Sequence, residues 1–83
     1  MIDIVLADEF WEGVEAGTEA LLDRWLVAEG DRVKAGQVVA GAVLVKTSVE
    51  IAAPADGVIE RILVAKDATF ARGKALAILR ETG

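Results

Sequence analysis

Residues 21–40, LLDRWLVAEGDRVKAGQVVA, return as residues 58–77, VIERILVAKDATFARGKALA, at an offset of 37 positions (58 minus 21). Gly36 meets Gly73 in this alignment, and apolar positions coincide with apolar positions along nearly the whole stretch. Chance can give a few identities, but a matched pattern of this length indicates an internal duplication. The chain is therefore expected to fold as two related halves.

The two copies, about residues 21–42 and 58–79, each hold runs rich in Val, Ile and Leu that are separated by turn residues. Such runs are typical of short β-strands. A copy of this size cannot bury its own apolar face, so each copy should pack on the other. We therefore predict one all-β domain over residues 1–83, a sandwich or barrel of two antiparallel sheets with quasi-twofold internal symmetry.

Turn residues set the limits of the expected strands. Residues 19–28 could also form a helix, but Gly17-Thr18 before them and the Glu29–Asp31 turn after them bracket a segment of strand length. We therefore favour a strand there. The expected strands are residues 2–6, 20–28, 37–45, 48–53, 57–65 and 75–80.

Lys46 has an informative place in the duplication. It lies between two β-rich runs, residues 38–45 and 48–53, with no glycine or asparagine to signal a turn. Shifted forward by the repeat offset, Lys46 falls on Gly83. Symmetry therefore predicts that the hairpin tip bearing Lys46 lies at the opposite end of the molecule from the C-terminus.

The stretch from Val45 to Ile59, VKTSVEIAAPADGVI, resembles the modification hairpin and following strand of lipoyl domains. The similarity extends to WLVAEGDRV at 25–33, to Gly36-Gln37 and to Glu12-Gly13, and it covers essentially the whole chain. The resemblance implies a flattened barrel of two antiparallel sheets, the barrel-sandwich fold, with the lysine at one tip.

The resemblance also implies a function. Lys46 would carry a covalent lipoyl group, and the domain would shuttle acyl or aminomethyl intermediates and reducing equivalents between the active sites of a multienzyme complex. The chain would be a non-catalytic carrier. Its partners would be a lipoate ligase or lipoyl transferase and the dehydrogenase and acyltransferase components of a 2-oxo acid or acetoin dehydrogenase-like complex.

Two positions beside the lysine depart from the family pattern. Val45 stands where acyltransferase-linked lipoyl domains commonly have an acidic residue, and Thr47 is the small residue that follows. A valine before the lysine is closer to the carrier protein of the glycine cleavage system. Val45 and Thr47 are therefore candidate partner-recognition residues, and recognition by a 2-oxo acid dehydrogenase is open.

Phe10 and Trp11 occupy a loop that is small and acidic in the family, and Glu12 follows them. By analogy this loop lies beside the lysine tip, which makes the three residues candidates for partner recognition. Trp11 has two alternative placements. If exposed, it forms an apolar rim with Val45 and a docking patch for a partner; if buried, it belongs to the core.

The composition excludes several other kinds of site. The chain has no cysteine or histidine, so disulfides, thiolate nucleophiles, imidazole bases and the usual zinc ligands are absent. The net charge of −5 argues against a nucleic-acid partner. The carboxylates Asp8, Glu9, Glu12 and Glu15 lack the ligand spacing of an EF-hand, so we expect neither a metal site nor an acid–base pair.

The same composition gives expectations about location and assembly. No apolar run is long enough to span a bilayer, and the N-terminus lacks a basic leader, so we expect a cytoplasmic monomer that does not bind membranes. The chain starts at Met1 and has no Pro/Ala-rich linker after its last expected strand, which favours a free-standing carrier over one cut from a longer chain.

Two other functions remain open at this point. A biotinyl carrier shares the architecture but usually has methionines on both sides of its lysine, where this chain has Val45 and Thr47. An unmodified adaptor or binding domain would keep the fold and lack the prosthetic group.

Overall fold

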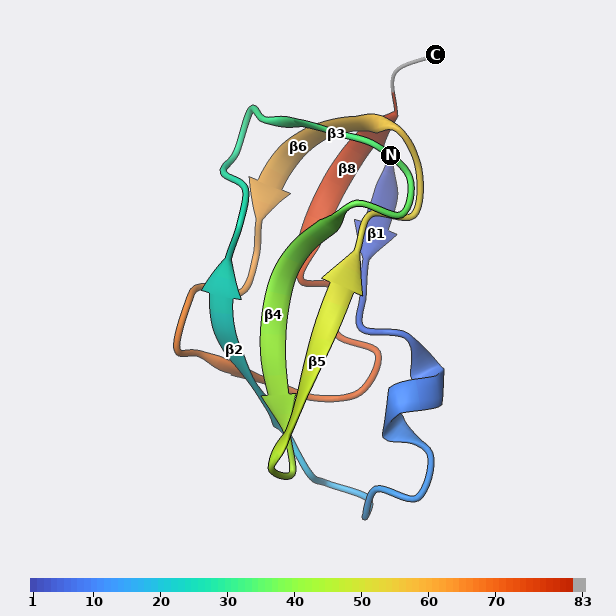
Figure 1. Cartoon of the computed structure of the whole chain (residues 1–83), viewed down its shortest axis with the longest axis vertical. Coiled ribbons are helices and arrows are strands. Elements are labelled where there is room, and N and C mark those ends of the chain that lie inside the picture. The colour runs from blue at the N-terminus through green and yellow to red at the C-terminus, as the bar shows by residue number, and fades with distance from the viewer. Residues whose placement is uncertain (82–83) are drawn as a thin grey trace.

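The structure, a computed structural model, describes residues 1–81, which form short strands and one 3-10 helix (Figure 1). The elements in chain order are β1 Ile2–Ile4, the 3-10 helix η1 Asp8–Trp11, β2 Ala20–Trp25, β3 Arg32–Val33, β4 Val38–Leu44, β5 Thr47–Ala52, β6 Gly57–Ile62, β7 Thr69–Phe70 and β8 Ala77–Glu81.

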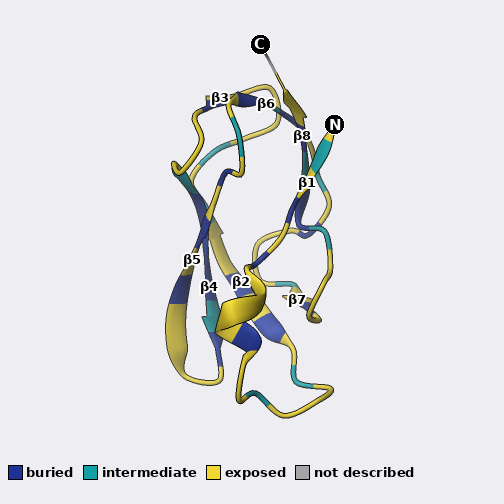
Figure 2. Ribbon diagram, turned by 90° about the vertical axis from the view of Figure 1, so that its right-hand side faces the viewer, coloured by how far each residue is buried: buried dark blue, intermediate teal, exposed yellow. Residues whose placement is uncertain are grey.

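The strands form two four-stranded antiparallel sheets, one in the order β1-β8-β6-β3 and the other in the order β5-β4-β2-β7. The sheets lie face to face, as Figure 2 shows from the side. The predicted all-β sandwich of two antiparallel sheets is confirmed.

The duplication is reproduced in the strand register. Leu22 pairs with Ala42, and the positions 37 residues later, Ile59 and Leu79, pair in the same way. Each long pair also contains a register shift, between Leu22 and Arg24 in the first copy and at the equivalent place in the second. Because even these irregularities recur, the quasi-twofold symmetry is a property of the backbone as well as of the sequence.

The equivalent edge strands of the two sheets, β5 and β1, come from different parts of the chain. β5 follows β4 directly along the chain, whereas the equivalent place beside β8 is filled by β1, from the other end of the chain. Ile4 on β1 pairs with Ala77 as Ile51 on β5 pairs with Ala40. The two sheets therefore have the same strand order but different chain connections.

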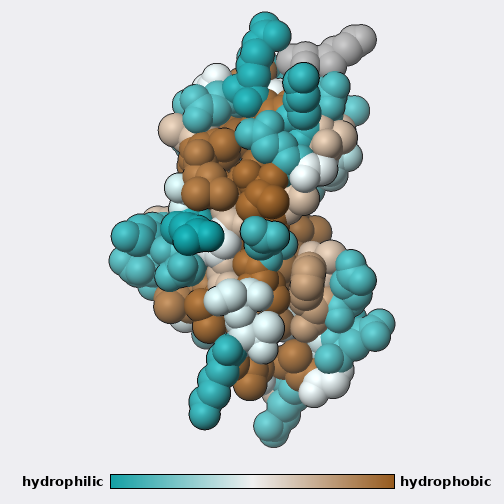
Figure 3. Space-filling model, in the orientation of Figure 1, coloured by the Kyte–Doolittle hydropathy of each residue, from teal (hydrophilic) through white to brown (hydrophobic). Residues whose placement is uncertain are grey.

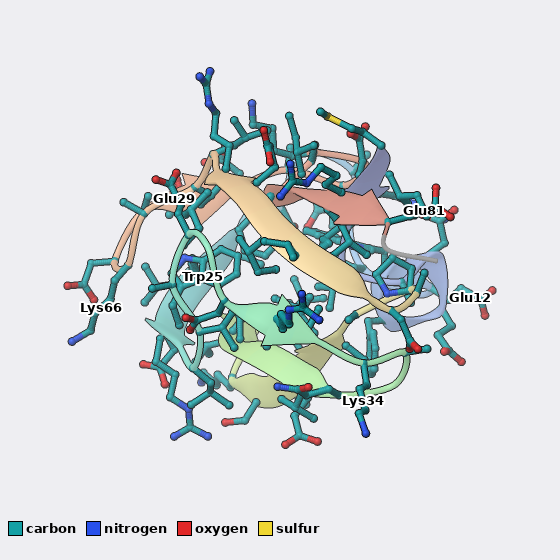
Figure 4. All side chains as sticks on the ribbon, turned by 90° about the horizontal axis from the view of Figure 1, so that it is seen from above. Glu12, Trp25, Glu29, Lys34, Lys66 and Glu81 are labelled. Carbon is teal, nitrogen blue, oxygen red and sulfur yellow. The ribbon has the colours of Figure 1, made fainter. Side chains whose placement is uncertain are left out.

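The core lies between the sheets and consists mainly of the alternate residues along each strand that face inward. Burying one Leu or Ile side chain fully contributes about 1.5–3 kcal/mol to stability. The largest fully buried side chains are Ile4, Leu22, Val39, Ile51, Ile59, Leu76 and Leu79. Trp25 also points between the sheets (Figure 4), and its indole N–H donates a hydrogen bond to the Val64 carbonyl at 2.8 Å. This bond links the two copies.

The six strands expected from the sequence correspond to β1, β2, β4, β5, β6 and β8, and the helix alternative for residues 19–28 is wrong. β2 ends at Trp25 because the chain then enters a turn in which the Asp31 carboxylate accepts a hydrogen bond from the Ala28 N–H at 2.8 Å. The two-residue strands β3 and β7 and the 3-10 helix were not predicted, since segments so short carry no periodic signal.

There is no room for a side chain at Gly57. A Cβ built there would lie 2.3 Å from the Arg80 carbonyl oxygen, so β6 can approach β8 this closely only without a side chain. Gly36 and Gly73 meet a different demand, since their φ angles of 85° and 83° lie in the left-handed region. The two glycines that the duplication aligns therefore adopt the same turn conformation.

The two ends of the long axis differ in what they carry. The N-terminus and the end of β8 at Glu81 lie at the upper end of Figure 1, and the turn between β4 and β5 lies at the lower end. Gly83, on which the symmetry argument placed the counterpart of Lys46, lies outside the described residues. The last described strand, β8, ends at Glu81, at the end of the molecule remote from the β4–β5 turn (Figure 1).

Candidate functional site

The candidate site is the tip of the hairpin formed by β4 and β5. Leu44 pairs with Thr47, so only Val45 and Lys46 make the turn. Their φ angles are 59° and 115°, in the region that glycine and asparagine usually supply in two-residue hairpin turns. A residue held in such a conformation stores about 1–3 kcal/mol of strain, and a β-branched valine is an unusual occupant.

Lys46 is exposed at this tip, and the residues behind it are anchored in the core. Leu44 and Val49 are both buried, and the β4–β5 ladder runs without interruption from Ala40 to Thr47. Among strand pairs of the described residues, β4–β5 is the one made by consecutive strands, so the domain has a single direct hairpin. A rigid ladder therefore presents an exposed primary amine to solvent.

Residues 8–18 lie beside the lysine tip and are held against the barrel by two side-chain contacts. Trp11, in the 3-10 helix, packs edge-to-face on Phe70 with ring centroids 6.2 Å apart. The Asp8 carboxylate forms an ion pair with Arg72, with Nε and Oδ1 3.3 Å apart. Both contacts join the N-terminal segment to the second copy near β7.

Of the two placements considered for Trp11, the structure shows the buried one. Its side chain is 3% exposed and belongs to the core cluster, so an exposed Trp11 rim with Val45 is not what the structure shows. The physical reason is that the 3-10 turn directs Trp11 inward onto Phe70 and leaves the adjacent Phe10 outside. Phe10 is 40% exposed and is the aromatic residue of this pair that reaches the surface.

The other four candidate recognition residues come together around one groove of about 410 Å³ beside the tip. Val45 and Thr47 line its hairpin wall, and Phe10 and Glu12 line the wall formed by the N-terminal segment. Glu12 points away from the sheets in Figure 4. The lining residues are Phe10, Glu12, Gly13, Val14, Glu15, Thr18, Leu44, Val45, Thr47 and Val49.

The segment beside the lysine also holds the excess negative charge of the protein. Residues 8–18 and the adjacent Glu19 together contain five carboxylates and no lysine or arginine. The remaining nine acidic residues balance the nine Lys and Arg, so this segment accounts for the formal net charge of −5. Its acidic residues are Asp8, Glu9, Glu12, Glu15 and Glu19. Of these carboxylates, Glu12 and Glu15 line the groove beside the lysine tip, and Asp8 is paired with Arg72, so the acidic surface at the tip comes from Glu12 and Glu15.

Sequence reasoning missed part of this site. Val14, Glu15 and Thr18 line the groove, but nothing in their local sequence distinguishes them from ordinary loop residues. The Asp8–Arg72 pair joins residues 64 positions apart, so no local pattern reveals it. These contacts depend on how the N-terminal segment crosses the barrel.

The described part of the chain contains neither the geometry of a metal site nor a membrane-spanning helix. Within residues 1–81, no three acidic side chains converge in a way that could hold a metal ion. The same residues contain no helix with the length and apolar character needed to cross a membrane.

Comparison with known proteins relates residues 12–79 to a family model for biotin and lipoyl attachment, described as "Biotin-requiring enzyme". The chain is 39% identical over 67 residues to the dihydrolipoyllysine-residue acetyltransferase component of the pyruvate dehydrogenase complex of Zymomonas mobilis. It is 43% identical over 60 residues to the human dihydrolipoyllysine-residue succinyltransferase component of the 2-oxoglutarate dehydrogenase complex, mitochondrial.

These matches cover 80% and 72% of this chain but only 15% and 13% of the respective relatives. The chain therefore spans a small part of the curated proteins that it resembles. A solved structure matches over 100% of both chains, with a TM-score of 0.79 and 28% identity. It is the solution structure of the lipoyl domain of the 2-oxoglutarate dehydrogenase complex from Azotobacter vinelandii.

Proposed function

The chain is a lipoyl domain of the biotin/lipoyl attachment family, and from this membership we propose that its carrier role depends on a lipoyl group joined to Lys46. The supporting observation is the position of Lys46 in the exposed two-residue turn of the single direct hairpin within residues 1–81. The other lysines, Lys34, Lys66 and Lys74, lie between strands that do not pair with each other.

The residues around Lys46 fit such a group. Formation of an amide bond to the carboxyl group of lipoic acid needs an amine that an enzyme can reach, and Lys46 is exposed on a ladder that holds it away from the core. When attached, the group supplies a dithiolane for acyl transfer and redox chemistry. The protein contributes the placement of the amine and the surface beside it.

Because the protein contributes only the placement of the amine and the surface beside it, the chain acts as a carrier that does no catalysis itself. We propose that a lipoate ligase or lipoyl transferase attaches the group in the cytoplasm. The relatives belong to pyruvate and 2-oxoglutarate dehydrogenase complexes, which supports components of a 2-oxo acid dehydrogenase complex as partners of a monomeric domain. Tethering keeps the carried group at a high local concentration near each partner, in the millimolar range for short flexible links.

Partner recognition is proposed to involve the residues nearest the lysine. Val45 and Thr47 flank it, and Phe10 and Glu12 form the opposite side of the same groove. Trp11 lies behind this surface and contributes by holding the 3-10 helix in place. A complex that acts on the arm would meet an acidic surface with apolar patches.

Intact-mass spectrometry after coexpression with a lipoate ligase tests the proposed attachment. We expect a single mass increment of one lipoyl group in the wild-type chain and none in the Lys46→Arg variant. Peptide mapping should place the group on Lys46, with Lys34 serving as an unmodified internal control. An unmodified wild-type chain, or a lipoyl group elsewhere, would refute the proposal.

The same preparation distinguishes the two other functions. Coexpression with a biotin ligase in place of the lipoate ligase should leave the mass unchanged, because the lysine lacks flanking methionines. Efficient biotinylation with no lipoylation would identify a biotinyl carrier. A folded chain that accepts neither group would be an adaptor domain of the same fold.

A further inference from the structure

Val45 combines a strained backbone with an exposed apolar side chain. Its φ of 59° is strained for a β-branched residue, and at 60% exposure its side chain gains little from burial that would offset this strain. Asparagine, aspartate or glycine would fit the turn better. Folding alone therefore gives no reason for a valine here.

Phe10 presents a second exposed apolar side chain on the same groove. The adjacent Trp11 is buried against Phe70, and Asp8 is paired with Arg72, so the 3-10 helix holds Phe10 in position from behind. An aromatic ring fixed in this way loses little side-chain freedom when another group covers it. The surface is therefore prepared for an apolar ligand.

The groove joins these two side chains directly beside Lys46. Both sequence neighbours of the lysine line it, together with Val14 and the largely buried Leu44 and Val49. Figure 3 shows apolar atoms reaching the surface at the lower end of the molecule, between projecting hydrophilic side chains. The polar rim includes Glu12 and Glu15, which disfavours an anionic ligand.

We propose that this groove is the resting site of the arm attached to Lys46, and that Phe10 and Val45 are its main walls. The proposal rests on the lipoyl attachment proposed above. The arm is uncharged, with an aliphatic chain that ends in a five-membered disulfide ring or, after reduction, in two thiols, so either form suits an apolar groove with an acidic rim. Covalent attachment at the edge of the groove gives the arm an effective concentration in the millimolar range, which allows even a weak site to be occupied.

The volume of the groove is compatible with this occupant, although other hollows on the surface are of similar size, so its position beside Lys46 is what singles it out. At about 410 Å³ it lies within the range of pockets that hold small organic ligands, roughly 300–1,000 Å³. A seated arm would cover the exposed faces of Phe10 and Val45 and would be released when a partner offers a better site. The carrier would thus alternate between a seated and an extended arm.

Nuclear magnetic resonance of the wild-type domain tests the seating without any substitution. Backbone amide shifts of the unmodified and lipoylated forms are compared, with the mass increment verified first. We expect changes at Phe10, Val14 and Val49 as well as at the turn, and nuclear Overhauser contacts between the arm and the Phe10 ring. Changes confined to residues 44–48 would reflect amide formation alone and would overturn the inference while leaving the lipoyl attachment intact.

Thiol reactivity gives a second readout. After reduction, the arm is treated with an uncharged aromatic disulfide, so that repulsion by the acidic surface does not affect the rate. We expect Phe10→Ser to raise the rate at least about threefold, because the seated population falls. Leu63→Ser is the matched control, since Leu63 is also 40% exposed but does not line the groove. Equal rates in wild type and Phe10→Ser, or equal acceleration by both substitutions, would overturn the proposal.

Discussion

The two sheets of this domain have the same strand order and register, yet only one carries the candidate site. In the sheet β5-β4-β2-β7, β4 runs directly into β5, and the two-residue turn displays Lys46. In the sheet β1-β8-β6-β3, the strand beside β8 is β1, which comes from the other end of the chain. The difference teaches that the duplication builds the scaffold, whereas chain connectivity decides which end becomes functional.

A second difference strengthens this contrast. The segment of residues 8–18, which brings Phe10 and the acidic surface to the lysine tip, connects β1 to β2 and precedes the first copy. It is held there by contacts with Phe70 and Arg72 of the second copy. The site therefore combines the hairpin of one half with a wall that the other half supports.

The largest effects should come from the equivalent core positions Leu22 and Ile59. Both side chains are fully buried, so truncation to alanine should lower the free energy of unfolding by about 4 kcal/mol in each case. Urea denaturation of Leu22→Ala and Ile59→Ala would measure both losses. A difference of more than about 2 kcal/mol would show that the two halves do not contribute equally to the core.

A smaller effect should distinguish Gly57 from its equivalent in the first copy, Ala20. An added Cβ at Gly57 meets the Arg80 carbonyl oxygen, so Gly57→Ala should lower stability by about 3 kcal/mol, at the upper end of overpacking effects. Ala20 is buried, and the β2–β4 pairing begins one residue later at Leu21, so a methyl group is accommodated.

The control for this substitution is Ala20→Gly, which should cost only about 1 kcal/mol through added backbone freedom. Thermal unfolding followed by circular dichroism measures both variants. Equal losses at the two sites would mean that β6 and β8 move apart to accept the methyl group.

Trp11→Ser should lower stability by about 2 kcal/mol. Loss of the buried ring is destabilising by more than this, but within the described residues the indole N–H has no hydrogen-bond partner, and its removal offsets part of the loss. Phe10→Ser is the adjacent control and should change stability by less than about 1 kcal/mol, because Phe10 is partly exposed. A negligible loss for Trp11→Ser in urea denaturation would contradict its assignment to the core.

The smallest effect is a gain in stability at the tip. Val45→Asn should raise the free energy of unfolding by about 1 kcal/mol, because asparagine tolerates a positive φ better than a β-branched valine. Ser48→Asn, one residue into β5, is the control and should be neutral or slightly destabilising. Differential scanning calorimetry of the two variants would detect the opposite signs, and a destabilised Val45→Asn would show that the turn is not strained.

The sequence predicted the scaffold well because it repeats. Gly36 and Gly73 reach the same left-handed conformation, and Leu22 and Ile59 reach the same buried position, so one alignment located both halves. The strand ends were less accurate, since β2 stops at Trp25 where the chain turns toward Asp31. Element ends depend on local hydrogen bonds that apolar periodicity does not encode.

The candidate site was predicted only in part. The sequence placed Lys46 at a tip remote from the chain ends and brought Phe10, Glu12, Val45 and Thr47 into consideration. It did not decide between the two placements of Trp11, because an apolar pair such as Phe10-Trp11 gives no indication of which ring turns inward. That choice follows from the 3-10 helix and from the position of Phe70.

By itself, the sequence determined the all-β class, the duplication and the lysine hairpin, because these depend on periodic patterns and on residues close together along the chain. Only the tertiary structure decided the groove, the burial of Trp11 and the pairing of Asp8 with Arg72. These features join segments that lie far apart in the sequence, and their contacts exist only once both sheets have packed.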